Sequence, residues 1–168
     1  MQLQQLDLSI GTNALAISPD GAHIVYTGPN ADLLLRDLDR FDATPIPGTE
    51  TGWSPCFSPD GDQLAFNTGF PGALRVVSLS GGTAVTLVAD STYGNGTAWS
   101  DDCWIYYVGS AGGHLGLMRI RASGGTPQLV AKPDPARDEL FFMWPYILPG
   151  GRTALITRFE ELQAKVGK

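Results

Sequence analysis

The chain has 168 residues and is acidic, with 17 Asp and Glu residues against 11 Lys and Arg residues and a formal net charge of −6. It has no run of Lys or Arg and no stretch near the roughly 18 apolar residues of a membrane span, so neither nucleic-acid binding nor membrane binding is expected. Its length suits one domain, and the 21 Gly and 12 Pro residues predict short elements joined by tight turns.

The first predicted element is a strand over residues 3–10. Leu6, Leu8 and Ile10 alternate there with polar neighbours, as expected of a strand that buries one face. No basic and apolar leader is visible before it, so the sequence shows no export signal. The compartment stays open between the cytoplasm and the periplasm.

A hairpin turn then recurs along the chain. The sequence Ser-Pro-Asp-Gly stands at residues 18–21 and 58–61, and weaker copies follow at residues 100–103 and 148–151. In this turn proline presets φ, aspartate favours the next position, and glycine accepts a positive φ without steric cost. The interval of about 40 residues is that of one β-propeller blade.

A second hairpin signal, Ser-Gly-Gly-Thr, lies between these turns at residues 80–83 and 123–126. β-branched and aromatic runs flank both kinds of turn, so each repeat is predicted to form four antiparallel strands. The predicted fold is all-β, a β-propeller with about 3.5–4 blades in this chain. The four predicted units cover residues 13–48, 53–89, 97–131 and 143–157.

Three departures from the repeat are informative. Asp101 replaces the turn proline and Cys103 the turn glycine, so the third hairpin either adopts another turn type or holds a cysteine at positive φ. The first unit has the longer segment 38–43 in place of the Gly-Gly pair. After residue 157 the sequence is helix-like or frayed, which predicts a tail over 158–168. The fourth unit therefore lacks outer strands, and the predicted strand 3–10 could complete this blade in their place.

The two kinds of hairpin, together with Met143-Trp144-Pro145-Tyr146 before the last turn, resemble TolB-like, WD40-like (PD40-type) β-propeller repeats. They are most similar in pattern to the propellers behind bacterial serine/threonine kinase domains. The resemblance covers roughly residues 12–158, and it implies a non-catalytic interaction or sensing domain. Because complete members have more blades, the chain resembles part of one.

Residues that could perform catalysis are few. Two cysteines, Cys56 and Cys103, lack the spacing of a zinc site and are expected to be buried free thiols. Two histidines, His23 and His114, fall at strand positions and lack a neighbouring nucleophile or metal-binding motif. No catalytic residue is therefore expected, and the chain is predicted not to be an enzyme.

The turn aspartates and the glycine-rich segments also have structural explanations. Asp20, Asp60 and Asp102 recur once per unit, so turn chemistry explains them better than a carboxylate cluster or a calcium site. The glycine-rich segment 109–113 lacks the following Lys-Ser/Thr of a phosphate loop and is expected to be a hairpin tip. Neither a metal nor a cofactor is therefore expected.

The candidate partner-binding residues are three aromatic residues, Trp53, Tyr93 and Trp144. They fall at the entry to predicted innermost strands, and aromatic residues are enriched among binding anchors. The alternative is that each packs between neighbouring blades. The two explanations make different predictions for the position of each ring.

An arc of about four blades would expose an apolar face at each end, because blades bury their faces against other blades. Either the chain closes as a four-bladed ring, or two copies form a homodimeric ring of about seven or eight blades, which we favour. The favoured function is a scaffold that binds a protein or peptide partner. The alternatives are a small-ligand or enzymatic site in the central channel, and a fragmentary product without a partner.

Overall fold

The computed structural model describes residues 15–111 and 113–160, which form strands and one short 3-10 helix, η1 (Pro135–Arg137). The predicted strand 3–10 lies outside the described residues. The strands are β1 (Leu15–Ile17), β2 (His23–Thr27), β3 (Leu33–Asp37), β4 (Ala43–Pro45), β5 (Gly52–Phe57), β6 (Gln63–Gly69), β7 (Gly72–Ser78), β8 (Val85–Trp99), β9 (Trp104–Ala111), β10 (His114–Arg121), β11 (Gln128–Ala131), β12 (Glu139–Ile147) and β13 (Ala154–Glu160).

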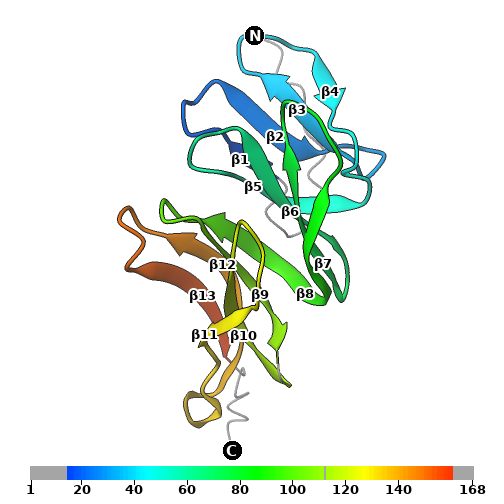
Figure 1. The fold of residues 1–168 in the computed structure, drawn as a ribbon. Helices are drawn as coiled ribbons and strands as arrows, with labels where there is room; N and C mark the ends of the chain where they lie inside the picture. The colour runs from blue at the N-terminus through cyan, green and yellow to red at the C-terminus, as the bar shows by residue number, and fades with distance from the viewer. Residues whose placement is uncertain (1–14, 112, 161–168) are drawn as a thin grey trace, which may run out of the picture.

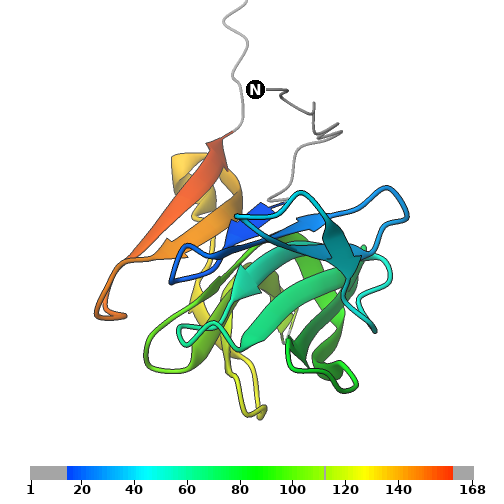
Figure 2. The ribbon, with the colours of Figure 1, turned by 90° about the horizontal axis from the view of Figure 1, so that it is seen from above.

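The strands form antiparallel sheets that follow one another along a curved path (Figure 1). We name these parts blades. Blade 1 is β1–β4. Blade 2 is β5–β7 with the first part of β8. Blade 3 is the last part of β8 with β9–β11, and blade 4 is β12 with β13. Figure 2 shows blade 4, in orange and red, at one side of the other sheets.

The repeated turn has the same backbone hydrogen bond in every blade. The amide of the fourth turn residue donates to the carbonyl of the first, at 2.9–3.1 Å in the four copies. In the first three copies the serine hydroxyl also donates to the carboxylate two residues later, as in Ser58 Oγ to Asp60 Oδ1 at 2.5 Å. The turn aspartates therefore stabilise hairpins, as the sequence indicates.

The third turn keeps this geometry despite its altered sequence. Cys103 adopts φ 63°, where the other copies have Gly21 (φ 71°), Gly61 (φ 81°) and Gly151 (φ 69°). The prediction that Cys103 is buried is wrong, because a residue at this hairpin tip projects into solvent. Cys56 is half-buried, and both cysteines are free thiols.

Blades 2 and 3 are joined more closely than the predicted units 53–89 and 97–131 suggest. One 15-residue strand, β8, pairs with β7 through Val85–Thr92 and with β9 through Thr92–Trp99. Gly94 (φ 60°) and Gly96 (φ 103°) lie in the irregular segment between the two paired parts. Because glycine readily adopts positive φ, the chain bends at this segment without ending the strand.

The predicted tail begins too early. Arg158, Phe159 and Glu160 belong to β13, the second strand of blade 4. Phe159 stacks on Phe141 with ring centroids 4.6 Å apart, and Arg158 forms an ion pair with Glu139 at 3.0 Å. These cross-strand contacts outweigh the helix-like local sequence, as tertiary context often does.

The hydrophobic core is divided among the spaces between successive blades. Leu64 and Phe66 of blade 2 pack toward blade 1, whereas Ala65 on the same strand packs toward blade 3. Tyr106 and Val108 of blade 3 pack toward Phe142 of blade 4. Among the described residues no buried cluster joins blade 1 to blade 4, so the blades form an arc in this structure.

Candidate functional site

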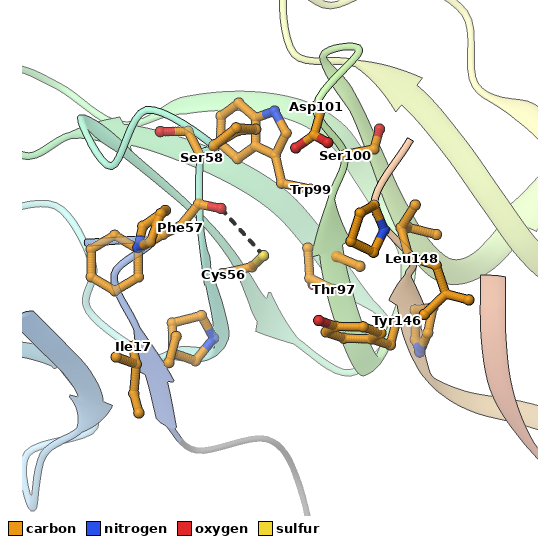
Figure 3. A pocket seen from close by; sticks show the side chains of 18 of the residues that line it. Ile17, Cys56, Phe57, Ser58, Thr97, Trp99, Ser100, Asp101, Tyr146 and Leu148 are labelled. Atoms are coloured by element: carbon orange, nitrogen blue, oxygen red, sulfur yellow. Dashed lines mark hydrogen bonds between the residues drawn. The ribbon is translucent and has the colours of Figure 1, made fainter. Parts of the chain in front are cut away.

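The candidate site is a central pocket formed where the innermost strands of the four blades converge. Its volume is about 450 Å³. Each blade contributes residues from the end of its innermost strand and the start of the turn that follows. These equivalent segments are residues 15–19, 55–59, 97–101 and 145–149 (Figure 3).

A bulge in each of three innermost strands precedes the pocket segment. The pairing register shifts between Trp53 and Cys56 in β5, and at equivalent places in β8 and β12. The residue four positions before the turn has positive φ in each case, namely Ser54 (50°), Gly96 (103°) and Trp144 (50°). A bulge redirects the side chains that follow it, so these three strands present the same positions to the pocket.

The bulges also hold neighbouring innermost strands together. Ser54 Oγ, which is buried, donates to the carbonyl of Gly94 at 2.9 Å and so joins blade 2 to blade 3. A Cβ at Gly96 would lie 2.7 Å from the Cα of Trp144, so blades 3 and 4 approach too closely for a side chain there. The pocket wall is therefore closely packed at the positions where one blade meets the next.

The pocket lining combines apolar, aromatic and hydroxyl groups with few ionisable ones. In Figure 3 the Cys56 thiol and the Tyr146 ring point into the pocket from opposite walls. Burial raises the pKa of the Cys56 thiol to about 11, so this group is a protonated thiol near neutral pH and a poor nucleophile. Asp101 contributes the one Asp or Glu side chain of the described lining residues.

A buried polar group lies behind the blade 3 wall of the pocket. The Asn67 amide donates to Thr97 Oγ1 at 2.6 Å, and Thr97 lines the pocket. Tyr107, which pairs with Thr97 across the sheet, is fully buried, and this burial raises the pKa of its phenol to about 12. A tyrosine phenol is neutral near pH 7 even without this shift, so the wall carries polarity without charge.

The three aromatic residues predicted from the sequence do not line the central pocket. Trp53 lies against Gly94 of the next blade, where an added Cβ would be 1.9 Å from the indole ring. Trp144 contacts Phe159 edge-on, with ring centroids 6.2 Å apart. The structure thus places both tryptophans in packing contacts, and their role in binding stays a prediction.

Tyr93 lies in a different, mainly apolar pocket of about 410 Å³ between blades 2, 3 and 4. Its ring meets Phe70 edge-on, with centroids 5.7 Å apart. The structure therefore does not bring Tyr93 together with Trp53 or Trp144 in one site. Its role in binding also stays a prediction.

Sequence reasoning missed the pocket residues Trp99, Asp101 and Tyr146. The repeat itself contained the signal, because these residues stand within two positions of the first turn residue, Ser100 or Leu148, in the segment that recurs in every blade. The aromatic search instead selected residues at the beginnings of the innermost strands. Those positions fall at or before the bulges, where side chains pack between blades.

Neither a metal centre nor a membrane span is found in the described residues. No group of three or more His, Cys, Asp or Glu side chains in residues 15–111 and 113–160 is placed to hold a metal ion. The same part of the chain has no helix long and apolar enough to cross a bilayer.

Known protein families and curated proteins give no match to this chain. Solved structures do. TolB from Acinetobacter baumannii superposes with a TM-score of 0.61 at 16% identity, over 88% of this chain and 41% of TolB. Oligogalacturonate lyase from Vibrio parahaemolyticus superposes with a TM-score of 0.64 at 11% identity, over 90% of this chain and 47% of the lyase. Kuenenia stuttgartiensis hydrazine synthase superposes with a TM-score of 0.57 at 13% identity, over 95% of this chain and 49% of the synthase chain.

The chain has a β-propeller fold of about three to four blades. TolB and oligogalacturonate lyase are propellers of the TolB/PD40 type, so the fold expected from the repeats is confirmed. At these identities the likeness concerns the fold alone. The chain spans less than half the length of each of these three neighbours.

Proposed function

We propose that this propeller is a non-catalytic binding module whose central pocket receives an extended segment of a protein or peptide partner. The observation that supports this is the convergence of four equivalent strand ends on one pocket. Trp99 is half-buried and Tyr146 is 61% exposed there, so both rings have surface left for a ligand. Aromatic residues on rigid strands are effective anchors because little conformational entropy is lost on binding.

Selection of peptides from a random library on the immobilised protein tests this proposal. Selected peptides are expected to bind Trp99→Ala and Tyr146→Ala variants at least ~10-fold more weakly, since each truncation removes an aromatic anchor. Phe70→Ala is the matched control, because Phe70 is 69% exposed and lines the other pocket. Peptides that bind both pocket variants as tightly as the unmodified protein would refute the central site.

We also propose that two copies associate into a composite ring. Ile17 of blade 1 is 57% exposed and Leu155 of blade 4 is 56% exposed. Each lies next to a residue of opposite orientation that packs into the arc, Ala16 or Ile156, so each faces away from the internal blade junctions. Ile17 also lines the central pocket. Two chains would supply seven or eight blades, which is in keeping with neighbours about twice as long.

The proposed role agrees with the resemblance of the repeats to propellers behind bacterial kinase domains, where such a propeller mediates interaction or sensing. A partner protein is therefore the ligand class that we expect first.

A small-ligand or enzymatic site in the same pocket is the second candidate. One fold neighbour is a lyase, and another oligogalacturonate lyase structure contains manganese. Asp101 is the carboxylate in this pocket that could act on a ligand. Turnover or binding of a sugar or metal ion that is lost in Asp101→Asn, with no peptide binding, would favour this candidate over the binding module.

A further inference from the structure

Blade 3 carries a basic and aromatic surface at the turn end of its outer strands. The guanidinium carbons of Arg119 and Arg121 lie 4.3 and 4.1 Å from the centroid of the Trp104 ring. Both cations thus crowd one indole, and neither forms an ion pair with a carboxylate of the described residues. Each guanidinium donates one described hydrogen bond, to Gln128 Oε1 or to the Asp102 carbonyl, so most of their N–H groups remain available.

The repeat shows that this surface is a departure. Cross-strand pairing makes Leu35 and Val76 the equivalents of Arg119 in blades 1 and 2. Val76 is buried and Leu35 packs against a buried cluster between blades. Where the first two blades use an apolar residue to contact the next blade, blade 3 has an arginine.

Blade 4 explains why a charge is tolerated there. In the described residues it consists of two strands, β12 and β13, which cover the inner part of blade 3 around Tyr106 and Leu117. In blade 2, by contrast, Val76 shares a buried cluster with Met118 and Ile120, which lie on the outer strand β10 of the next blade. Arg119 has no corresponding described strand over it.

Blade 1 has an acidic loop at the equivalent end of its outer strands. Residues 38–42 replace the Gly-Gly turn, and Phe41 at the tip is 90% exposed. Arg40 pairs with Asp37 at 3.5 Å, whereas neither Asp39 nor Asp42 forms an ion pair with any described residue. The loop therefore presents two free carboxylates beside an exposed aromatic ring.

We propose that the acidic loop of one copy, residues 38–42, docks on the Trp104, Arg119 and Arg121 surface of a second copy. This inference rests on the composite ring proposed above, in which blade 1 of the second copy follows blade 4 of the first. The acidic loop and the basic surface then lie at the same end and at the same distance from the ring axis. Both border the place that outer strands of blade 4 would occupy, so the loop must extend into that place to reach the basic surface.

The loop supplies what the basic surface lacks. Asp39 and Asp42 provide carboxylates for two guanidinium groups, whose planar donors suit carboxylates. Phe41 provides apolar area for the space beside the two-stranded blade 4. A twofold axis repeats the contact, so each dimer has two such junctions.

Charge reversal tests the docking with a built-in control for folding. Arg119→Glu/Arg121→Glu and Asp39→Arg/Asp42→Arg should each weaken the homodimer at least ~10-fold, because both junctions then bring like charges together. An equimolar mixture of the two variants should form a heterodimer, since both of its junctions are again complementary. All four substitutions in one chain should likewise restore the homodimer. Lys132→Glu, an exposed cation of the described chain, is the matched control.

Analytical ultracentrifugation at several salt concentrations separates the outcomes. The docking is supported if each charge-reversal variant dimerises weakly alone and the mixture of the two dimerises well. The dimer of the unmodified protein should also weaken as the salt concentration rises. Variants that dimerise like the unmodified protein would overturn the docking and leave the composite ring standing. A monomeric unmodified protein at all concentrations would overturn both, and variants that stay monomeric when mixed would overturn the docking alone.

Discussion

At the residue scale, Cys103 shows how strongly the hairpin geometry is imposed. The side chain is exposed and its φ of 63° lies in the left-handed region, so it has strain without compensating burial. We expect Cys103→Gly to raise the free energy of unfolding by about 0.5–1 kcal/mol, because glycine adopts this φ without the Cβ clash. Urea denaturation measures this, and Cys103→Ala, which keeps the Cβ, should give no comparable gain. Equal stability of the two variants would show that the turn stores no such strain.

Asp20 and Asp60 make a second residue-scale prediction, on pH. Hydrogen bonds from Ser18 and Ser58 hold the pKa of these carboxyls below the ordinary value of 3.8. A pKa lowered on folding means that the stabilisation is present above the unfolded-state pKa and is lost as pH falls through the folded one. Thermal unfolding from about pH 6 to about pH 2 should therefore show a shallower acid decline in Asp20→Asn/Asp60→Asn. Matching declines in both proteins would contradict this.

At the scale of the elements, the bulge of β8 packs too closely against Trp53 of β5 to accept a side chain. A Cβ at Gly94 would lie 1.9 Å from the Trp53 ring, and Gly94 has φ 60°. We expect Gly94→Ala to destabilise by about 2–4 kcal/mol, since overpacking and left-handed strain add. Trp53→Ala should remove the overpacking part, so the double variant should be less destabilised than the two single effects summed. Additive effects in urea denaturation would show that the ring and the glycine are not coupled.

The elements also show how much of the fold could be read from the sequence. The Ser-Pro-Asp-Gly turns were predictable because proline, aspartate and glycine act on their own backbone, and the hairpins at residues 18–21 and 58–61 confirm this. The continuity of β8 could not be predicted from the sequence, because it depends on pairing with β7 and β9 at once. Likewise β13 extends to Glu160 because of Phe141 and Glu139, which lie on another strand.

The central pocket shows the same division between local and long-range information. Its positions follow from the repeat, because residues 55–59, 97–101 and 145–149 are equivalent. Its shape could not be read from the chain, because the bulge before Tyr146 in β12 lies against another blade, where a Cβ at Gly96 would be 2.7 Å from the Cα of Trp144. The sequence search for aromatic residues therefore favoured Trp53 and Trp144, which pack between blades.

At the scale of the whole molecule, the two ends of the arc differ from its internal junctions. Each internal junction between blades buries a hydrophobic cluster, and the end faces carry exposed Ile17 and Leu155. A head-to-tail dimer with a twofold axis would place the blade 4 face of each copy on the blade 1 face of the other. Every blade would then have a neighbour on both sides.

Substitution of the end faces tests this arrangement. Leu155→Glu and Ile17→Glu each place a charge in both junctions of the dimer. Each junction then loses the burial of one apolar side chain, which is worth about 1.5–3 kcal/mol. The dissociation constant of the dimer should therefore rise at least ~100-fold. Val85→Glu is the matched control, because Val85 is 60% exposed but lies within the arc on β8. Light scattering on a sizing column over a range of concentrations measures the mass. The expected masses are near twice 17.9 kDa for the unmodified protein and the control, and near 17.9 kDa for the two face variants. If the face variants keep the doubled mass, the end faces are not where the copies meet, and the ring must close differently.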